Sequence, residues 1–215
     1  MEWGEAGEDL SILEINEDFL IATMPQKYKD AGLTNVALLP DGKDFMIHTP
    51  RANTLISRAS YSDKVHHSAV RCISWSTAAG LSVEHTDLYL ARCSEKKLVE
   101  LWGPRLRKCP GATPRFPKGW VMLSDRGFAN TMNLYPNWNA QLTPTFLNGR
   151  LQFGAGEVSK DRDICKLRYT CEVAFARVVE EAGLRDVIPF HFFASLDAMN
   201  HWGHANVNLG APLCK

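Results

Sequence analysis

Three carboxylates in this chain have the types and the order that metal-dependent phosphodiester chemistry requires. Asp41 follows the apolar run N-V-A-L-L-P, and Asp125 follows the run W-V-M-L-S. Glu172 lies in the amphipathic stretch ICKLRYTCEVAFARV at 164–178. Acids at two strand ends and on a helix can converge on Mg²⁺, which prefers oxygen ligands and keeps several waters. Two such ions can activate a water and stabilise the leaving oxygen of a phosphodiester.

Each of these acids also has a simpler explanation. Asp41 precedes a glycine, a pair typical of a hairpin turn. Asp125 could form a turn or cap a helix. Glu172 could be a solvated helix residue, or the partner of Arg168 one turn earlier. The residue types alone therefore leave the metal site as one interpretation among several.

The elements that would position the acids follow from the apolar pattern. It predicts a hairpin of strands at 35–39 and 45–48 with a tight turn at Asp41, and later strands at 70–76, 81–90 and 120–124. Residues 51–64 are polar and predict a loop, and 95–102 have helical spacing. The order of these elements indicates a mixed α/β fold around one central sheet.

A long helix is predicted from about residue 159 to 181, ended by Gly183. Its apolar residues recur at the i, i+3, i+4, i+7 spacing of one helix face. At about 100° per residue, Glu172 falls at the edge of this face, on the side of Arg168. A carboxylate there can face a cleft while its neighbours pack into the core.

Composition limits the class of protein. A chain of 215 residues with 45% hydrophobic residues is long enough for one domain with a sizeable core. It has no run of about 18 apolar residues, so we expect no membrane span, and no secretory signal is visible at its start. Its six cysteines lack a C-x-x-C pair, which favours reduced core thiols inside the cell over a zinc site.

The formal net charge of zero hides an uneven distribution. Residues 1–20 carry seven acidic residues and no lysine or arginine, which predicts an acidic N-terminal tail before a single domain at 21–215. Residues 104–118 carry five basic residues and no acid, and this segment resembles an inserted basic loop. Such a loop can contact phosphates without reading sequence, although on composition alone a solvated Pro/Gly loop is the favoured interpretation.

Several short motifs occur along the chain in a fixed order. They are LLPDGKDFMIHTP at 38–50, SYSDKVHHSAVRCISW at 60–75, Ser94-Glu95, Asp125-Arg126-Gly127-Phe128, PTFL at 144–147, LRYTCEVAFARV at 167–178 and NLGAPL at 208–213. In order and spacing, they resemble the catalytic domain of DDE-superfamily transposases, specifically the Harbinger-like group, from about residue 20 to the end. The resemblance implies a ribonuclease H-like α/β fold, with a mixed sheet flanked by helices.

The resemblance also implies a function. Asp41, Asp125 and Glu172 would be the DDE triad, binding two Mg²⁺ or Mn²⁺ ions for DNA strand cleavage and transfer. The partner would be duplex DNA, contacted mainly through its backbone, and the protein would be nuclear by family analogy and otherwise intracellular. The resemblance does not define the oligomeric state and is compatible with an oligomer.

Departures from the family pattern support an alternative. Val173 replaces the arginine that usually follows the catalytic glutamate, Glu95 replaces an aspartate, and the Tyr-Lys pair of the second motif appears as Lys64-Val65. The segment before Asp41 is short and acidic, so we expect no helix-turn-helix reader there, and a separate DNA-binding partner protein could supply recognition. The alternative is a domesticated or truncated transposase-derived protein that acts as a non-catalytic DNA- or protein-interaction module.

Overall fold

The computed structural model describes residues 16–107, 119–128, 131, 140–210 and 213. Its strands are β1 (Val36–Met46), β2 (Tyr61–Ser62), β3 (His67–Ser76), β4 (Ser82–His85), β5 (Tyr89–Leu90), β6 (Val121–Leu123) and β7 (Ala140–Leu142). Its α-helices are α1 (Glu17–Thr23), α2 (Gln26–Asp30), α3 (Thr54–Ser60), α4 (Glu95–Arg107), α5 (Ala155–Glu181) and α6 (Leu196–Leu209). Short 3₁₀ helices include η1 (Arg126–Phe128) and η3 (Phe190–Ser195).

Seven strands in the described residues form one mixed sheet. Its main order is β2-β3-β1-β6-β7, and β4 and β5 both pair with β3. β1 and β3 are antiparallel, whereas β6 is parallel to β1 and β7 is parallel to β6. The sheet therefore has an antiparallel half early in the chain and a parallel half built by later segments.

β1 corrects the predicted hairpin at Asp41. It is one continuous strand of 11 residues, and Asp41 and Gly42 lie in its middle, opposite Ser74 and Ile73 of β3. Pro40 fits because β6 pairs with β1 only near Val36 and Leu38, so no neighbouring strand needs its missing N–H. The Asp-Gly pair therefore lies within an extended strand and does not form a turn.

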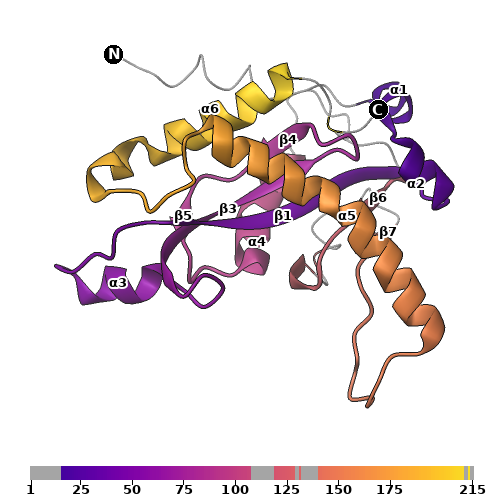
Figure 1. The fold of residues 1–215 in the computed structure, drawn as a ribbon, viewed down its shortest axis with the longest axis horizontal. Helices are drawn as coiled ribbons and strands as arrows, with labels where there is room; N and C mark the ends of the chain where they lie inside the picture. The colour runs from indigo at the N-terminus through magenta and orange to yellow at the C-terminus, as the bar shows by residue number, and fades with distance from the viewer. Residues whose placement is uncertain (1–15, 108–118, 129–130, 132–139, 211–212, 214–215) are drawn as a thin grey trace.

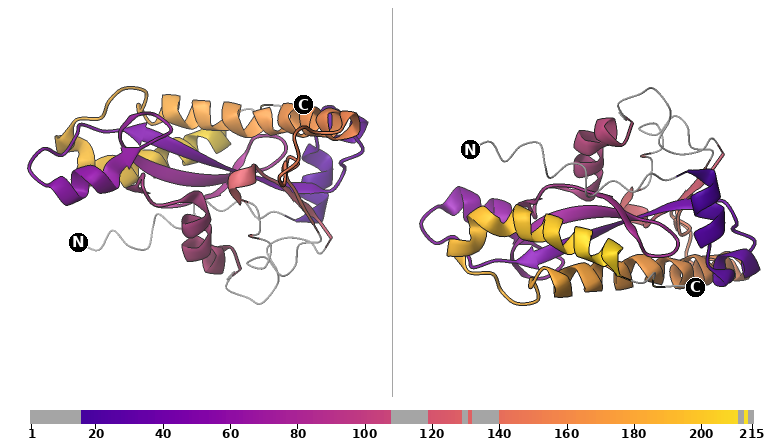
Figure 2. Two further views of the ribbon diagram at one scale, coloured as in Figure 1. Left: turned by 90° about the horizontal axis from the view of Figure 1, so that it is seen from below. Right: turned by 90° about the horizontal axis from the view of Figure 1, so that it is seen from above.

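Helices cover both faces of the sheet. α5 and α6 pack together on one face, and α4 lies on the other (Figures 1 and 2). The core between the sheet and these helices contains fully buried side chains such as Leu38, Trp75, Leu98 and Leu123. Each hydrophobic face of the sheet is thus covered by helices, which gives the three-layer architecture expected for a mixed sheet.

Local signals explain where the long helix begins and ends. The Glu157 carboxylate accepts a hydrogen bond from the Gly154 N–H at 2.8 Å, which caps the start of α5. Gly183 follows the helix with a positive φ of 67°, the conformation that ends many helices. α5 is therefore four residues longer at its start than the periodicity predicts, because the apolar pattern does not extend into its exposed first turn.

The other strands, helices and loops predicted from the sequence are confirmed in part. The strands at 70–76, 81–90 and 120–124 are confirmed in outline as β3 to β6, and the helix at 95–102 continues to Arg107 as α4. The polar segment 51–64 is not only loop, since it contains α3, whose start is capped by the Asn53 side chain. Most of the basic segment, 108–118, lies outside the described residues, as does the acidic stretch 1–15.

The architecture is a ribonuclease H-like α/β fold, as the sequence predicts: the antiparallel strands β1 to β5 are followed along the chain by the parallel strands β6 and β7, and helices flank the sheet. α1 already belongs to this body, because Leu20 is 2% exposed and packs into the core. None of the described helices combines the length and the apolar character that crossing a membrane needs.

Candidate active site

Asp41 lies at the centre of the sheet, on the side covered by α5. Its side chain is 21% exposed. Together with Ser74 and Cys171 it helps line a cavity of about 10 Å³, room for about one water. Burial raises the pKa of Asp41, although the charges of Arg168 and Lys64 oppose the shift. A cation beside Asp41 therefore strongly favours the charged form of this carboxylate.

Asp125 comes to the same region through the parallel strand. Val121 and Met122 of β6 pair with the start of β1, so the chain leaving β6 runs alongside the segment that leads to Asp41. The Asp125 side chain is 52% exposed, and its Oδ1 accepts a hydrogen bond from the Arg126 N–H at 2.6 Å. Asp125 thus combines the predicted strand-end position with a capping role at η1.

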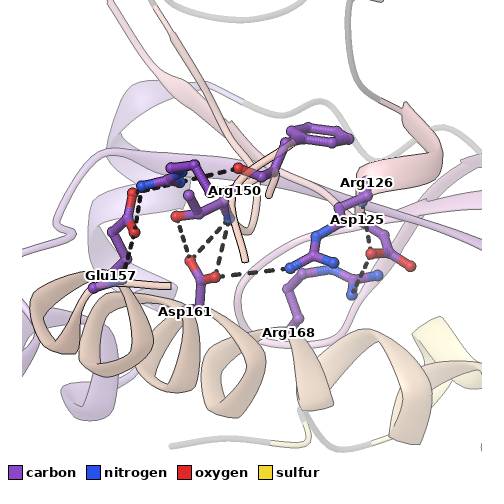
Figure 3. A network of polar contacts seen from close by, with 9 residues as sticks. Asp125, Arg126, Arg150, Glu157, Asp161 and Arg168 are labelled. Carbon is purple, nitrogen blue, oxygen red and sulfur yellow. Dashed lines mark hydrogen bonds and ion pairs between the residues drawn. The ribbon is translucent and has the colours of Figure 1, made fainter. Parts of the chain in front are cut away.

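Arg168 joins the two aspartates. One guanidinium nitrogen, Nη2, lies 3.6 Å from Asp41 Oδ1, and the other, Nη1, lies 3.9 Å from Asp125 Oδ1. The Arg168 side chain is only 9% exposed and projects from α5 toward the sheet (Figure 3). Two acids far apart in the sequence are therefore brought within ion-pair distance of one cation.

Glu172 lies one turn after Arg168 on α5 and differs from it in burial. It is exposed, whereas Arg168 and Cys171 on the same helix are buried. Arg168 pairs with the aspartates in the described structure, so the suggested i, i+4 pair with Glu172 is not the interaction it makes. The structure places Asp41 and Asp125 together and leaves Glu172 on the adjoining surface of the helix.

A fourth carboxylate reaches the site from the opposite face of the sheet. Glu95, the first residue of α4, is half-buried, and its carboxylate lies against the backbone of both Gly42 and Gly127. Lys64 donates to the Gly42 carbonyl oxygen at 3.1 Å, so this lysine also lies beside the site. The sequence showed both residues only as departures from a family pattern, and their pairing with the two glycines needs the tertiary structure.

Next to this cluster, a polar network anchors the loop that leads into α5. Asp161 accepts hydrogen bonds from the Thr145 N–H and hydroxyl, each at 2.9 Å, and pairs with Arg126 at 3.8 Å. Arg150 binds Glu157 through two hydrogen bonds of 3.0 Å (Figure 3). These contacts hold the 145–150 segment against the helix and hold Arg126 beside Asp125.

The carboxylates suit a hard divalent cation in chemistry and charge. Asp41 and Asp125 offer oxygen donors, and they already surround a positive group, Arg168. Across the described part of the chain, however, no three His, Cys, Asp or Glu side chains are arranged to hold a metal ion. Asp41 and Asp125 are thus the residues that could hold a metal, with Glu172 the nearest predicted addition on α5.

A histidine cluster lies apart from this site. His201 and His204 lie one turn apart on α6, and both contact His85 of β4. The ring of His85 stacks on His204 with centroids 4.0 Å apart and contacts His201 through their ring nitrogens. His204 Nδ1 lies 2.7 Å from the Ser82 hydroxyl oxygen. These contacts attach α6 to the sheet.

Comparison with known proteins decides the family. Residues 40–181 match the family model described as DDE superfamily endonuclease. The chain belongs to this family. No curated protein and no solved structure matches it. The matched segment begins next to Asp41 and contains Asp125, Arg168 and Glu172, so the site described above lies wholly inside the DDE endonuclease domain.

Family membership supports a nuclease or transposase type of function, with DNA as the substrate. DDE-superfamily endonucleases generally use divalent metals, which agrees with the paired carboxylates. Sequence reasoning had no role for Arg168 beyond a helix salt bridge. The signal available was its position on the predicted helix, at the edge of the apolar face, where a charged residue can turn inward.

Proposed function

We propose that this DDE endonuclease domain cleaves DNA phosphodiester bonds and joins strands, using Mg²⁺ or Mn²⁺ held by Asp41, Asp125 and Glu172. The observation that carries the proposal is the meeting of Asp41 and Asp125 at one cation, Arg168, inside the matched domain. When bound, the divalent ions would supply Lewis-acid stabilisation and an activated water.

The acidic and basic residues of the site would have different roles. Asp41, held in the middle of a paired strand, supplies a rigid ligand, and Asp125 supplies an exposed one that DNA can approach. Glu172 would complete the set from α5, because the helix presents it on the surface adjoining Arg168. The exposed cations Lys64 and Arg126 flank the two aspartates and would contact the DNA backbone.

The test is Mn²⁺-dependent cleavage and strand transfer on duplex DNA by the wild type and by Asp125→Asn. Loss of one carboxylate removes both a ligand and a charge, so we expect the rate to fall by about 100-fold or more. Asp163→Asn is the matched control, since Asp163 is an exposed acid of α5 with only a 3.9 Å contact to Lys166. Full activity of Asp125→Asn would contradict the assignment.

Glu172 needs its own comparison because α5 places it, and not the strands that position the two aspartates. We expect Glu172→Gln to lose activity as Asp125→Asn does, whereas Glu181→Gln, an exposed glutamate on the same helix, should keep it. Loss with Asp125→Asn but not with Glu172→Gln would leave a two-aspartate site without the predicted third ligand. The nuclear location stays a prediction from the family.

One observation favours the alternative of a non-catalytic interaction module derived from a transposase. A guanidinium stands between Asp41 and Asp125, and Glu172 is turned to solvent. A module of this kind would bind DNA or a protein partner, including a separate DNA-binding protein, without metal-dependent cleavage. Salt-sensitive DNA binding by the wild type that gives no product with Mg²⁺ or Mn²⁺ would support it over the nuclease.

A further inference from the structure

We propose that the Arg168 guanidinium is a resident cation that holds Asp41 and Asp125 in the metal-free protein and is displaced when a divalent ion binds. The inference rests on the proposed function and adds a competition between the protein's own cation and the metal. Its consequence is that metal affinity is set partly by a residue that is not a metal ligand.

The first support is the position of the guanidinium. Its two terminal nitrogens face different carboxylates, Nη2 toward Asp41 and Nη1 toward Asp125. The side chain is 9% exposed, so its charge acts in a region with little water and is not merely a solvated surface charge. Arg168 therefore occupies the place between the aspartates where a shared metal ion would be attracted.

The second support is that Arg168 is loosely held. Its contacts of 3.6 and 3.9 Å to the aspartates are longer than charge-assisted hydrogen bonds, and its buried Nε has no hydrogen-bond partner among the described residues. Arg71 provides the comparison within the same sheet. Its Nε and Nη2 donate to the Asp44 carboxylate at 2.6 and 2.9 Å, directly across the β1–β3 pair. Arg71 has the geometry of a permanent ion pair, and Arg168 does not.

The third support is charge balance. Asp41, Asp125, Glu95 and Asp161 bring four negative charges to this region. Arg168, Lys64 and Arg126 bring three positive ones. Exchanging one guanidinium for a divalent cation adds positive charge to a region that still has a negative excess. An incoming metal must, however, overcome the repulsion of Arg168, so removal of that charge should strengthen metal binding.

The experiment measures Mn²⁺ binding without DNA, from the loss of the free Mn²⁺ signal in electron paramagnetic resonance. Arg168→Met removes the charge and keeps an unbranched side chain in the same place. We expect it to bind Mn²⁺ about tenfold or more tightly than the wild type. Arg162→Met is the matched control, since it removes the same charge from an exposed position on α5. We expect the control to bind as the wild type does.

Tighter binding separates displacement from a structural role, because a residue that merely supports the site would weaken binding when removed. Affinity of Arg168→Met equal to or below that of Arg162→Met overturns the inference, and the proposed function stands if the wild type still cleaves DNA. If no variant binds Mn²⁺, the inference is also overturned, and cleavage by the wild type then reports separately on the proposed function.

A second measurement on the wild type covers the case in which Arg168→Met fails to fold. The Nε–H resonance of Arg168, assigned by its absence in Arg168→Lys, is followed during a Mg²⁺ titration. Displacement predicts a saturable shift of this resonance, with no comparable shift for Arg71, whose pair with Asp44 stays closed. An Arg168 resonance that is unchanged at saturating Mg²⁺ overturns the inference.

Discussion

Glu95 gives a physical reason for the glycine that follows Asp41 and for the one two residues after Asp125. A Cβ atom built on either Gly42 or Gly127 would collide with the Glu95 carboxylate. The glycines leave room for the Glu95 carboxylate and do not serve a special backbone angle, because neither has a positive φ. Glu95 therefore rests directly under the chain that carries both aspartates and can position them through the backbone.

The prediction at this scale concerns Gly42→Ala. We expect it to lower the free energy of unfolding by about 1 kcal/mol, because the added methyl displaces the Glu95 side chain. In the double variant Gly42→Ala with Glu95→Ala, this cost should largely disappear, giving a clear coupling energy in urea denaturation. Gly156→Ala is the control, since a Cβ there meets no atom within 4 Å. Additive effects at Gly42 and Glu95 would contradict the packing argument.

At the scale of elements, α5 links the catalytic region to the loop before it. The helix packs against β1 and β3 with its C-terminal part, and its N-terminal part projects beyond the sheet together with the 143–154 segment (Figure 1). Asp161 joins this projecting part to Thr145 and Arg126. Arg126 also lies over the rings of Phe146 and Phe153 at 5.9 and 5.5 Å. Movement of the loop would therefore move the residue next to Asp125.

Asp161→Asn should loosen this loop while the sheet stays intact. An asparagine side chain has one acceptor oxygen for the Thr145 hydrogen bonds where the carboxylate has two, and it carries no charge to attract Arg126. We therefore expect a loss of about 1 kcal/mol of stability. Limited proteolysis should show faster tryptic cleavage after Arg150. Asp163→Asn changes an exposed acid two residues away and should leave the rate as in the wild type. Equal cleavage rates in both variants would show that Asp161 does not anchor the loop.

At the scale of the whole molecule, the histidine cluster between α6 and the sheet makes the stability of the fold depend on pH. Burial lowers the pKa of His204 to about 3 and that of His85 well below its ordinary value, and the neighbouring histidines add to both shifts. Both rings are therefore neutral in the folded protein. Unfolding exposes them to water, where each takes up a proton near pH 6.5.

The sign of the pH dependence follows from these shifts. The unfolded chain binds more protons than the folded one below about pH 6.5, so stability is full above that pH and is lost as the pH falls toward the folded pKa values. Between pH 7 and 5 the free energy of unfolding should fall, with a slope approaching about 1.4 kcal/mol per pH unit for each histidine. Urea denaturation across this range gives the slope.

Two variants test the source of this slope. His204→Gln removes one of the two buried groups and should make stability less dependent on pH. His48→Gln changes an exposed histidine and should leave the slope as in the wild type. Parallel curves for the wild type and His204→Gln would show that acid sensitivity arises elsewhere.

The sequence by itself determined the kind of fold and the family, because these depend on local order along the chain. Apolar periodicity located the strand before Asp125 and most of α5, and the ordered motifs identified a DDE-superfamily domain, which the family match confirms. Asp41 and Asp125 were selected from the same local signal, an acid that follows an apolar run. Their roles as metal ligands, and that of Glu172, stay predictions.

Only the tertiary structure decided which side chains meet. Asp-Gly at 41–42 looks like a turn locally, but pairing with β3 along its length keeps β1 extended through it. Arg168 and Glu172 lie one helical turn apart and differ little in sequence pattern, yet packing turns Arg168 inward and leaves Glu172 in solvent. Contacts such as Arg168 with Asp41, or Glu95 with Gly127, join residues distant in the chain, and hydrophobic periodicity carries no information about such pairs.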